Sequence, residues 1–445
     1  MMTLRLAAIA AACIPVFSQA ADPPPGIVGK DGWLFYRYEA SDPSHAADTK
    51  TSVQLIAKLA RVLAKNDVAV LVTLVPVKMR IYATNLPPDF PLSPHMKAQY
   101  GQFAGMLRAQ KVPFVDLDSA FMQSAKKDSD TPLFLHQDTH WSPVGAFTAA
   151  EAIKAAIDAD PGLAAIVESV PPATYRIAWD MNLKPTTAND LAGQLPAGTP
   201  KMEREAVITF GVSREKSQAG LLDDSGVPAI TLLGSSYSSD WTQFPSALRY
   251  ALQRDVLSIA VPATQGSWIG MESYLRDDAF QAHPPKLLVW EMPERDMVGP
   301  PNFKYREARY QVDNTDWLLR AAAWATPKCE AARATVKTTS GKLSAAGPSA
   351  PGDSIEVTFT RAVDRTEYVS ARLTAYGSQR VKLDSSGAGT SAKSVELAVA
   401  GDDEPHTFKT PLGKGHDKMR LTPGKTHAFK LEDVKVCRQM EGLLD

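Results

Sequence analysis

A run of apolar and mostly β-branched residues, Val68 to Val75, constrains the fold of this chain more than any other feature. The run does not alternate with polar residues, so it is typical of a strand buried on both faces, as in a parallel sheet. Similar runs cover residues 113–117, 229–233, 256–260 and 286–290, and helical spacing occurs at 53–63, 96–109, 143–158 and 241–254. This alternation predicts an α/β fold with a mainly parallel sheet.

Smaller signals refine this prediction. Asp31-Gly32 indicates a hairpin turn, and Ser142 followed by Pro143 is typical of the start of a helix. Residues 161–218 are rich in Pro, Thr and small residues and break the α/β rhythm, so we interpret them as an insertion near the site. From about residue 326 the pattern changes to short alternating runs between Gly, Pro, Asp and Ser, which predicts a small β-sandwich over 326–445.

The N-terminus has the pattern of an export signal. Arg5 precedes an apolar run over residues 6–17, and small residues follow, so residues 1–20 are predicted to be a cleaved secretory signal peptide. Lipid attachment at Cys13 is the alternative. In an exported protein the remaining pair, Cys329 and Cys437, predicts one disulfide that closes the C-terminal domain; two free thiols are the alternative. The formal net charge of −1 provides no global field for nucleic acid.

Three residues have the chemistry of a nucleophilic catalyst. Asp138 and His140 lie two positions apart, and Ser236 follows the apolar run 229–233 about a hundred residues later. A carboxylate that orients an imidazole, which in turn activates a hydroxyl, is the arrangement needed for acyl transfer. The alternatives are a turn for the Asp-x-His pair, and turn or cap roles for the serines of Ser235–Ser238.

Other polar residues follow the same predicted strands. Arg295 is a candidate for binding a substrate carboxylate, with an ion pair to Glu291 or Glu294 as the alternative. Lys78 and Arg80, with Tyr82, follow the 68–75 run and are expected at the same edge of the sheet, where they would line the cleft and Lys78 and Arg80 would contact substrate.

No cofactor or metal is expected, because the sequence has no P-loop, no Gly-rich dinucleotide turn and no Cys/His metal spacing. Metal ligation by His136, Asp138 and His140 is the alternative.

Together these motifs resemble one family, the periplasmic alginate O-acetyltransferases of the AlgX type, related to AlgJ. The resemblance covers nearly the whole mature chain and implies a circularly permuted SGNH-hydrolase-like three-layer domain over 27–325, joined to a carbohydrate-binding module over 326–445. It implies Ser236 as nucleophile and Asp138 and His140 as acid and base. The matching segments are Gly29–Phe35, His136–Trp141, Gly234–Ser238 and Trp290–Arg295.

The implied activity is transfer of an acetyl group through a Ser236 acyl-enzyme onto hydroxyls of an exported polyuronate, alginate mannuronate, in the periplasm. Backbone amides near Ser236, together with Tyr237, would stabilise the oxyanion. The implied partners are an anionic polysaccharide, an acetyl donor or membrane acetyl-export protein, and other exopolysaccharide secretion proteins. A polysaccharide acetylesterase and a non-catalytic polymer-binding scaffold are the alternatives.

The C-terminal module departs from the family in one respect, because no Trp occurs after Trp324. Tyr376 is expected to supply aromatic stacking in place of the family's tryptophan. Basic residues around it would pair with uronate carboxylates. These are Arg372, Arg380, Lys382 and Lys409.

Overall fold

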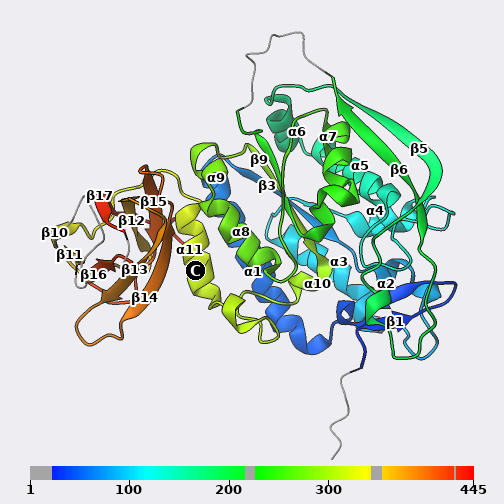
Figure 1. Ribbon diagram of the computed structural model, residues 1–445, viewed down its shortest axis with the longest axis horizontal. Coiled ribbons are helices and arrows are strands. Elements are labelled where there is room, and N and C mark those ends of the chain that lie inside the picture. The colour runs from blue at the N-terminus through cyan, green and yellow to red at the C-terminus, as the bar shows by residue number, and fades with distance from the viewer. Residues whose placement is uncertain (1–22, 216–225, 342–352, 425–426) are drawn as a thin grey trace, which may run out of the picture.

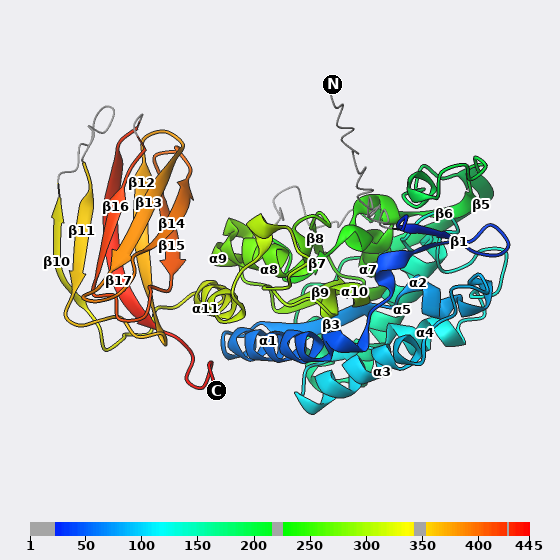
Figure 2. The ribbon, with the colours of Figure 1, turned by 90° about the horizontal axis from the view of Figure 1, so that it is seen from below.

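The computed structural model describes residues 23–215, 226–341, 353–424 and 427–445, and shows an α/β part beside a β-rich C-terminal part (Figures 1 and 2). The expected signal peptide and Cys13 lie outside the described residues. Within the described ranges, no helix is long and apolar enough to cross a membrane.

The α/β part is built on one five-stranded sheet with the order β4-β3-β9-β7-β8, in which every neighbouring pair is parallel. The predicted parallel sheet is therefore confirmed. The central strands are buried on both faces, which explains their continuous apolar sequence. The strands are β3 (Ala69–Val75), β4 (Phe114–Val115), β7 (Ile230–Gly234), β8 (Leu257–Ala260) and β9 (Leu287–Pro293).

Helices cover both faces of this sheet and complete three layers (Figure 2). Along β3, Leu71 and Val75 join one core cluster, and Val70, Val72 and Leu74 join the other. The first cluster packs under α4 (Leu117–Gln123), α5 (Pro143–Ala159), α6 (Pro161–Glu168) and α7 (Phe244–Leu252). The second packs under α1 (Ala46–Lys65), α3 (Pro94–Ala109), α8 (Gly266–Arg276) and α11 (Asn314–Trp324).

The start of α5 confirms the predicted cap, because the Ser142 hydroxyl accepts a hydrogen bond from the Gly145 amide at 3.1 Å and Pro143 is the first helical residue. The prediction of a helix over 241–254 is wrong at its start. Residues Ser236–Ser238 and Asp240–Thr242 form two 3₁₀ turns, and α7 begins only at Phe244. Gln243 has a φ of 63°, a left-handed conformation that separates these turns from the helix.

Two antiparallel hairpins lie outside the central sheet. The first pairs β1 (Gly26–Val28) with β2 (Leu34–Tyr36) and turns at Asp31-Gly32, both with positive φ, as predicted. The second pairs β5 (Tyr175–Pro185) with β6 (Ala206–Arg214) and lies within the 161–218 stretch that the sequence left unassigned, after α6.

The C-terminal part is a sandwich of two antiparallel sheets, as predicted, with the orders β10-β11-β16-β13-β14 and β15-β12-β17. Cys329 and Cys437 form the predicted disulfide. The sequence did not reveal β10 and β13. The strands are β10 (Val336–Gly341), β11 (Ile355–Phe359), β12 (Glu367–Ala375), β13 (Gln379–Ser386), β14 (Lys393–Val399), β15 (Pro405–Thr410), β16 (Lys418–Thr422) and β17 (Phe429–Arg438).

Candidate active site

Ser236 lies at the carboxyl end of β7, where ligands gather in parallel α/β sheets. It begins the 3₁₀ turn Ser236–Ser238, which packs tightly against the strand. A Cβ at Gly234 would collide with the Ser238 side chain and with the Glu291 carboxylate, so the approach requires glycine.

Asp138 and His140 lie on a tight turn that is closed by the isolated antiparallel bridge between Phe134 and Trp141. Oδ1 of Asp138 accepts the His140 backbone N–H at 2.9 Å and lies 2.6 Å from Nδ1 of the ring. The two side chains therefore meet because the backbone bends, and not because they share one side of a strand.

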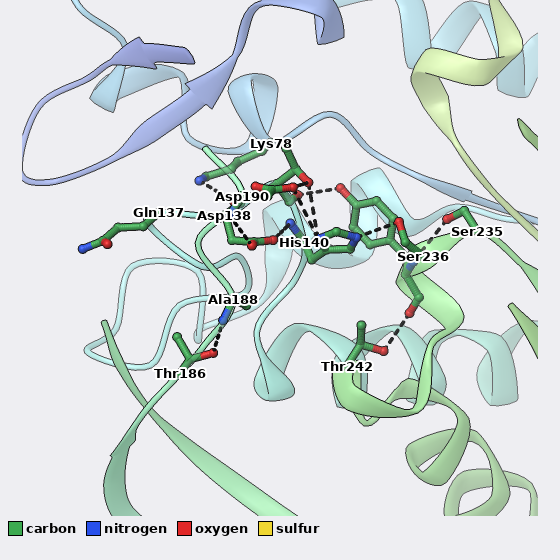
Figure 3. Close-up of polar contacts among 12 residues, drawn as sticks. Lys78, Gln137, Asp138, His140, Thr186, Ala188, Asp190, Ser235, Ser236 and Thr242 are labelled. Carbon is green, nitrogen blue, oxygen red and sulfur yellow. Dashed lines mark hydrogen bonds and ion pairs between the residues drawn. The ribbon is translucent and has the colours of Figure 1, made fainter. Parts of the chain in front are cut away.

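The turn places the His140 ring beside Ser236, so that Nε2 of His140 lies 2.7 Å from Oγ of Ser236 (Figure 3). Asp138 and His140 are buried, and Ser236 is partly exposed to the cleft. Burial alone would raise the pKa of Asp138. The hydrogen bonds from the His140 side chain, and those from the His140 and Asp190 amides, lower this pKa below its ordinary value instead. The carboxylate is thus ionised and faces the ring nitrogen that must stay protonated.

Glu291, near the carboxyl end of β9, holds the turn around Ser236 in place through hydrogen bonds. Its carboxylate accepts hydrogen bonds from the Ser235 amide at 2.7 Å, from the Ser235 hydroxyl at 2.9 Å and from the Ser238 hydroxyl at 2.9 Å. Burial raises the pKa of Glu291 to about 7, even though these hydrogen bonds favour the charged form.

The sequence did not reveal Asp190, a residue of the insertion that braces the Asp-Thr-His turn (Figure 3). Its carboxylate accepts from the Thr139 amide at 2.8 Å and from the Thr139 hydroxyl at 2.6 Å, and its own amide donates to Oδ2 of Asp138 at 2.9 Å. Burial, and next the charge of Asp138, raise the pKa of Asp190. The only signal in the sequence was that an insertion occurs at all.

The expectation that Lys78 contacts substrate is corrected, because its side chain is buried and does not line the cleft. Its ammonium donates to the carbonyl oxygens of His136 at 2.9 Å and of Asp138 at 3.0 Å. Burial lowers the pKa of Lys78 to about 8. Lys78 therefore supports the turn from behind.

The expectation for Arg80 is corrected in the same way. Its guanidinium forms a two-pronged pair with Glu294, at 2.8 and 2.6 Å, and a third contact with Asp118 at 2.7 Å. This pairing also removes Glu294 as a partner for Arg295. The Tyr82 hydroxyl donates to the Lys127 carbonyl at 3.0 Å, so it too serves the core.

His136 turns away from the site, and its Nδ1 lies 2.7 Å from Glu205, so ligation of a metal by His136, Asp138 and His140 does not fit. Asp138, His140 and Asp190 do place potential ligand atoms within 4.8 Å of one another. Both ring nitrogens of His140 already face protein partners, so an ion there would displace one of these hydrogen bonds.

The site opens into a cleft of about 1020 Å³, which Arg295 also lines. The carboxylate nearest to Arg295 is that of Glu39, at 3.7 Å, and the Arg295 guanidinium lies 5.8 Å from the ring centroid of Tyr237.

Tyr237 itself is buried and donates its hydroxyl to the Thr139 carbonyl at 2.6 Å, so the expected substrate contact of its side chain is corrected. Its amide donates to the Ser235 hydroxyl at 3.2 Å. The Ser236 amide has no acceptor among the described residues.

In the C-terminal sandwich, the expected polymer contacts divide into two groups. The first group, Arg372, Tyr376, Arg380 and Lys382, is exposed, and Lys382 and Arg380 form surface ion pairs with Asp384 and Glu396, each at 2.9 Å. Lys409 is buried against the α/β part and donates to Gln281 at 3.0 Å and to the Thr326 carbonyl at 2.7 Å, so its expected uronate contact is corrected. Burial lowers its pKa to about 8.

Comparison with known proteins assigns the chain to a family. Residues 27–294 match the family model described as SGNH hydrolase-like domain, acetyltransferase AlgX. The chain is 31% identical over 287 residues to a probable alginate O-acetylase AlgJ of Pseudomonas aeruginosa, covering 61% of this chain and 70% of the relative. It is 29% identical over 213 residues to the alginate biosynthesis protein AlgX of Pseudomonas fluorescens, covering 45% of this chain and 42% of the relative.

Solved structures agree on the fold. The O-acetyltransferase domain of Pseudomonas putida AlgJ superposes with a TM-score of 0.56 at 25% identity, over 67% of this chain and 99% of that domain. Pseudomonas aeruginosa AlgX superposes with a TM-score of 0.64 at 16% identity, over 93% of this chain and 95% of that protein, which shows the same two-part fold. Taken with the matched residues, these findings show that the chain belongs to the AlgX family of SGNH hydrolase-like acetyltransferases.

Proposed function

We propose that this protein transfers acetyl groups, through an acyl-enzyme on Ser236, onto hydroxyls of an exported anionic polysaccharide such as alginate, acting in the periplasm. One observation carries the proposal, namely the chain of hydrogen bonds from Ser236 Oγ to His140 at 2.7 Å and from His140 to Asp138 at 2.6 Å. Kinship with AlgJ, named a probable alginate O-acetylase, supports the choice of acyl group and acceptor.

In the first half-reaction, Nε2 of His140 accepts the proton of Ser236 while Oγ attacks the acetyl carbonyl of the donor. Asp138 fixes the ring tautomer and stabilises the imidazolium. The Ser236 amide, which has no acceptor in the described part of the chain, would donate to the oxyanion. The donor's leaving group departs with the proton from His140, and the acetyl ester of Ser236 remains.

In the second half-reaction, a sugar hydroxyl gives its proton to His140 and attacks the acetyl ester. The tetrahedral intermediate collapses, Ser236 leaves and takes the proton back, and the acetylated sugar is released. Transfer must exceed hydrolysis, so the acceptor must displace water from the ester. Arg295, at the cleft wall, is the residue that would hold the uronate carboxylate for this step.

The remaining assignments extend this proposal. Residues 27–325 would form the acetyltransferase domain and residues 326–445 the polymer-binding module, with Tyr376 and Arg372 as its exposed contacts. The acetyl donor would come from a membrane acetyl-export partner within an exopolysaccharide secretion system.

The test uses the full mature chain with a chromogenic acetyl ester as donor. Intact-protein mass spectrometry is expected to show one added acetyl group on the peptide that contains Ser236, and none in Ser236→Ala or His140→Ala. With oligomannuronate added, new acetyl esters should appear on the oligomer. Release of free acetate alone would identify an esterase. Unaltered polymer acetylation in cells carrying Ser236→Ala would identify a scaffold.

A further inference from the structure

The cleft contains a second group of lining residues, held together by its own contacts. The rings of His45, Phe303 and Tyr305 lie 5.3 to 6.3 Å apart, centroid to centroid, and form an aromatic wall. Tyr305 is 70% exposed, which is unusual in a chain whose other large rings are mostly buried. An exposed aromatic face in a cleft fits the apolar C–H face of a sugar ring.

Arg306 lies beside this wall and has an incomplete set of partners. One Nη donates to the Gly299 carbonyl at 3.1 Å, whereas Nε is buried without an acceptor. Among the described residues, Arg306 forms no ion pair. A buried guanidinium nitrogen without a partner is costly, so an acceptor from a ligand would stabilise it.

The same guanidinium faces the first turn of α8. A Cβ at Gly266, the first residue of α8, would collide with Nη1 of Arg306, so the two lie in direct contact. No side chain caps this helix. The Gly266 amide donates to the Pro262 carbonyl at 3.3 Å, and the end of the helix carries a partial positive charge. Two positive groups therefore face one another at the cleft wall, an arrangement that a bound anion would stabilise.

Neither of the two nearby acids forms an ion pair with Arg306 among the described residues, although the negative charge of Asp296 acts on its guanidinium. Asp296 accepts the Ser267 hydroxyl at 2.7 Å, and Glu307 pairs with Arg309 at 2.8 Å. On the other side, the Lys304 ammonium lies 4.7 Å from the centroid of the Tyr305 ring and adds positive charge. Glu39 Oε2 and His45 Nδ1, also from residues that line the cleft, are buried without partners and could bind sugar hydroxyls.

We propose that the wall of His45, Phe303 and Tyr305, with Arg306 and the first turn of α8, is an accessory subsite for a second uronate residue of the acceptor chain. The ring would stack on Tyr305, and its carboxylate would bind Arg306 and the amides of α8. This inference rests on the proposed function, because it assumes that the acceptor is a uronate polymer. It implies that the enzyme recognises an oligomer and not a single sugar.

The test measures binding by calorimetry in a Ser236→Ala background, where no turnover occurs. The probes are a monomannuronate, a trimannuronate and a trimer whose carboxylates are reduced to alcohols. The trimannuronate is expected to bind more tightly than either of the others. Arg306→Ala should weaken trimannuronate binding about tenfold, the size of one charge-assisted contact. Its advantage over the reduced trimer should shrink by the same factor and not vanish, because Arg295 still binds one carboxylate.

Tyr305→Ala provides a second variant whose folding is not at risk, since the ring is exposed. It should weaken both trimers about fivefold, because stacking does not depend on charge. The matched control Tyr310→Ala alters the same segment outside the cleft and should leave trimer binding unchanged.

Equal trimannuronate affinity in Arg306→Ala and its parent would overturn the proposal, and so would tighter binding of the reduced trimer. An Arg306→Ala effect on the acetyl donor alone would assign the group to the donor instead and also overturn it. Failure of the proposed function is seen separately, as the absence of acetyl on Ser236 by mass spectrometry.

Discussion

The ammonium of Lys78 lies 3.0 Å from the carbonyl oxygen of Asp138, the residue whose carboxylate orients His140. A lysine buried behind the turn thus fixes the backbone on which the proposed base depends.

Lys78→Met should leave the Asp138 carbonyl without a donor and the His136 carbonyl with only the Leu34 amide, at a cost of about 1–3 kcal/mol in the free energy of unfolding. Because the turn can then shift, the rate of Ser236 acetylation should fall about tenfold or more. Urea denaturation and burst kinetics with a chromogenic ester measure the two effects. Lys154→Met, which alters an exposed lysine, is the control. Acetylation at the unaltered rate in Lys78→Met would contradict the positioning role.

Asp190 should matter through Thr139 and not through contact with substrate. Asp190→Asn keeps one side-chain oxygen for the two Thr139 donors, whereas Asp190→Ala keeps none, and both retain the amide that binds Asp138. We therefore expect kcat for acetyl-enzyme formation to fall about tenfold in Asp190→Ala and less in Asp190→Asn. Steady-state kinetics with both variants checks the order. Equal loss in the two variants would indicate that the negative charge acts directly.

Glu291 should make stability depend on pH. Its pKa is raised from 4.5 to about 7 by burial, so the folded state binds its proton more tightly than the unfolded state. The stability that this carboxyl contributes is present below pH 4.5 and is lost as the pH rises through about 7, with a full span of about 3 kcal/mol. In Glu291→Gln this part of the pH dependence should disappear. Melting temperatures of both proteins between pH 5 and 8 test the difference, and parallel curves would refute the assignment.

The Cys329–Cys437 disulfide should stabilise the C-terminal sandwich without affecting the chemistry. The cysteines are 108 residues apart, so the chain-entropy model assigns the cross-link about 4–5 kcal/mol. In the double variant Cys329→Ser, Cys437→Ser, calorimetry should show a lower melting temperature for the sandwich. Acetylation of Ser236 by a chromogenic ester should proceed at the parent rate. Loss of acetylation at a temperature where the α/β part remains folded would show coupling between the two parts.

Much of the fold could be predicted because its signals are local. The apolar run that became β3 and the Ser142-Pro143 start of α5 each specify their element through a few adjacent residues. The strand β13 alternates buried positions with exposed or half-buried ones, but it escaped prediction because only Val381 and Leu383 are apolar and a serine, Ser385, takes the third buried position. The start of α7 was misplaced because the left-handed Gln243 has no distinctive sequence signal.

Residues of the site could be predicted from the sequence only where the residue type itself indicates a chemical role. Asp138, His140 and Ser236 were identifiable by type and by resemblance, and the structure brings them together. Lys78 and Arg80 were misassigned because position after a strand does not reveal whether a side chain points into the cleft or into the core. That direction is decided by distant partners such as Glu294, which no local pattern can indicate.

The Asp138–His140 turn is held by Lys78 from one side, and by Asp190 and Glu205 from the insertion on the other. Segments so distant along the chain come together only when tertiary structure is complete. A chain with all its helices and strands formed, but with these loops not yet docked, would lack the proposed catalytic arrangement. During refolding, hydrolysis of a chromogenic ester would therefore begin only when folding is complete, after the helices and strands have formed.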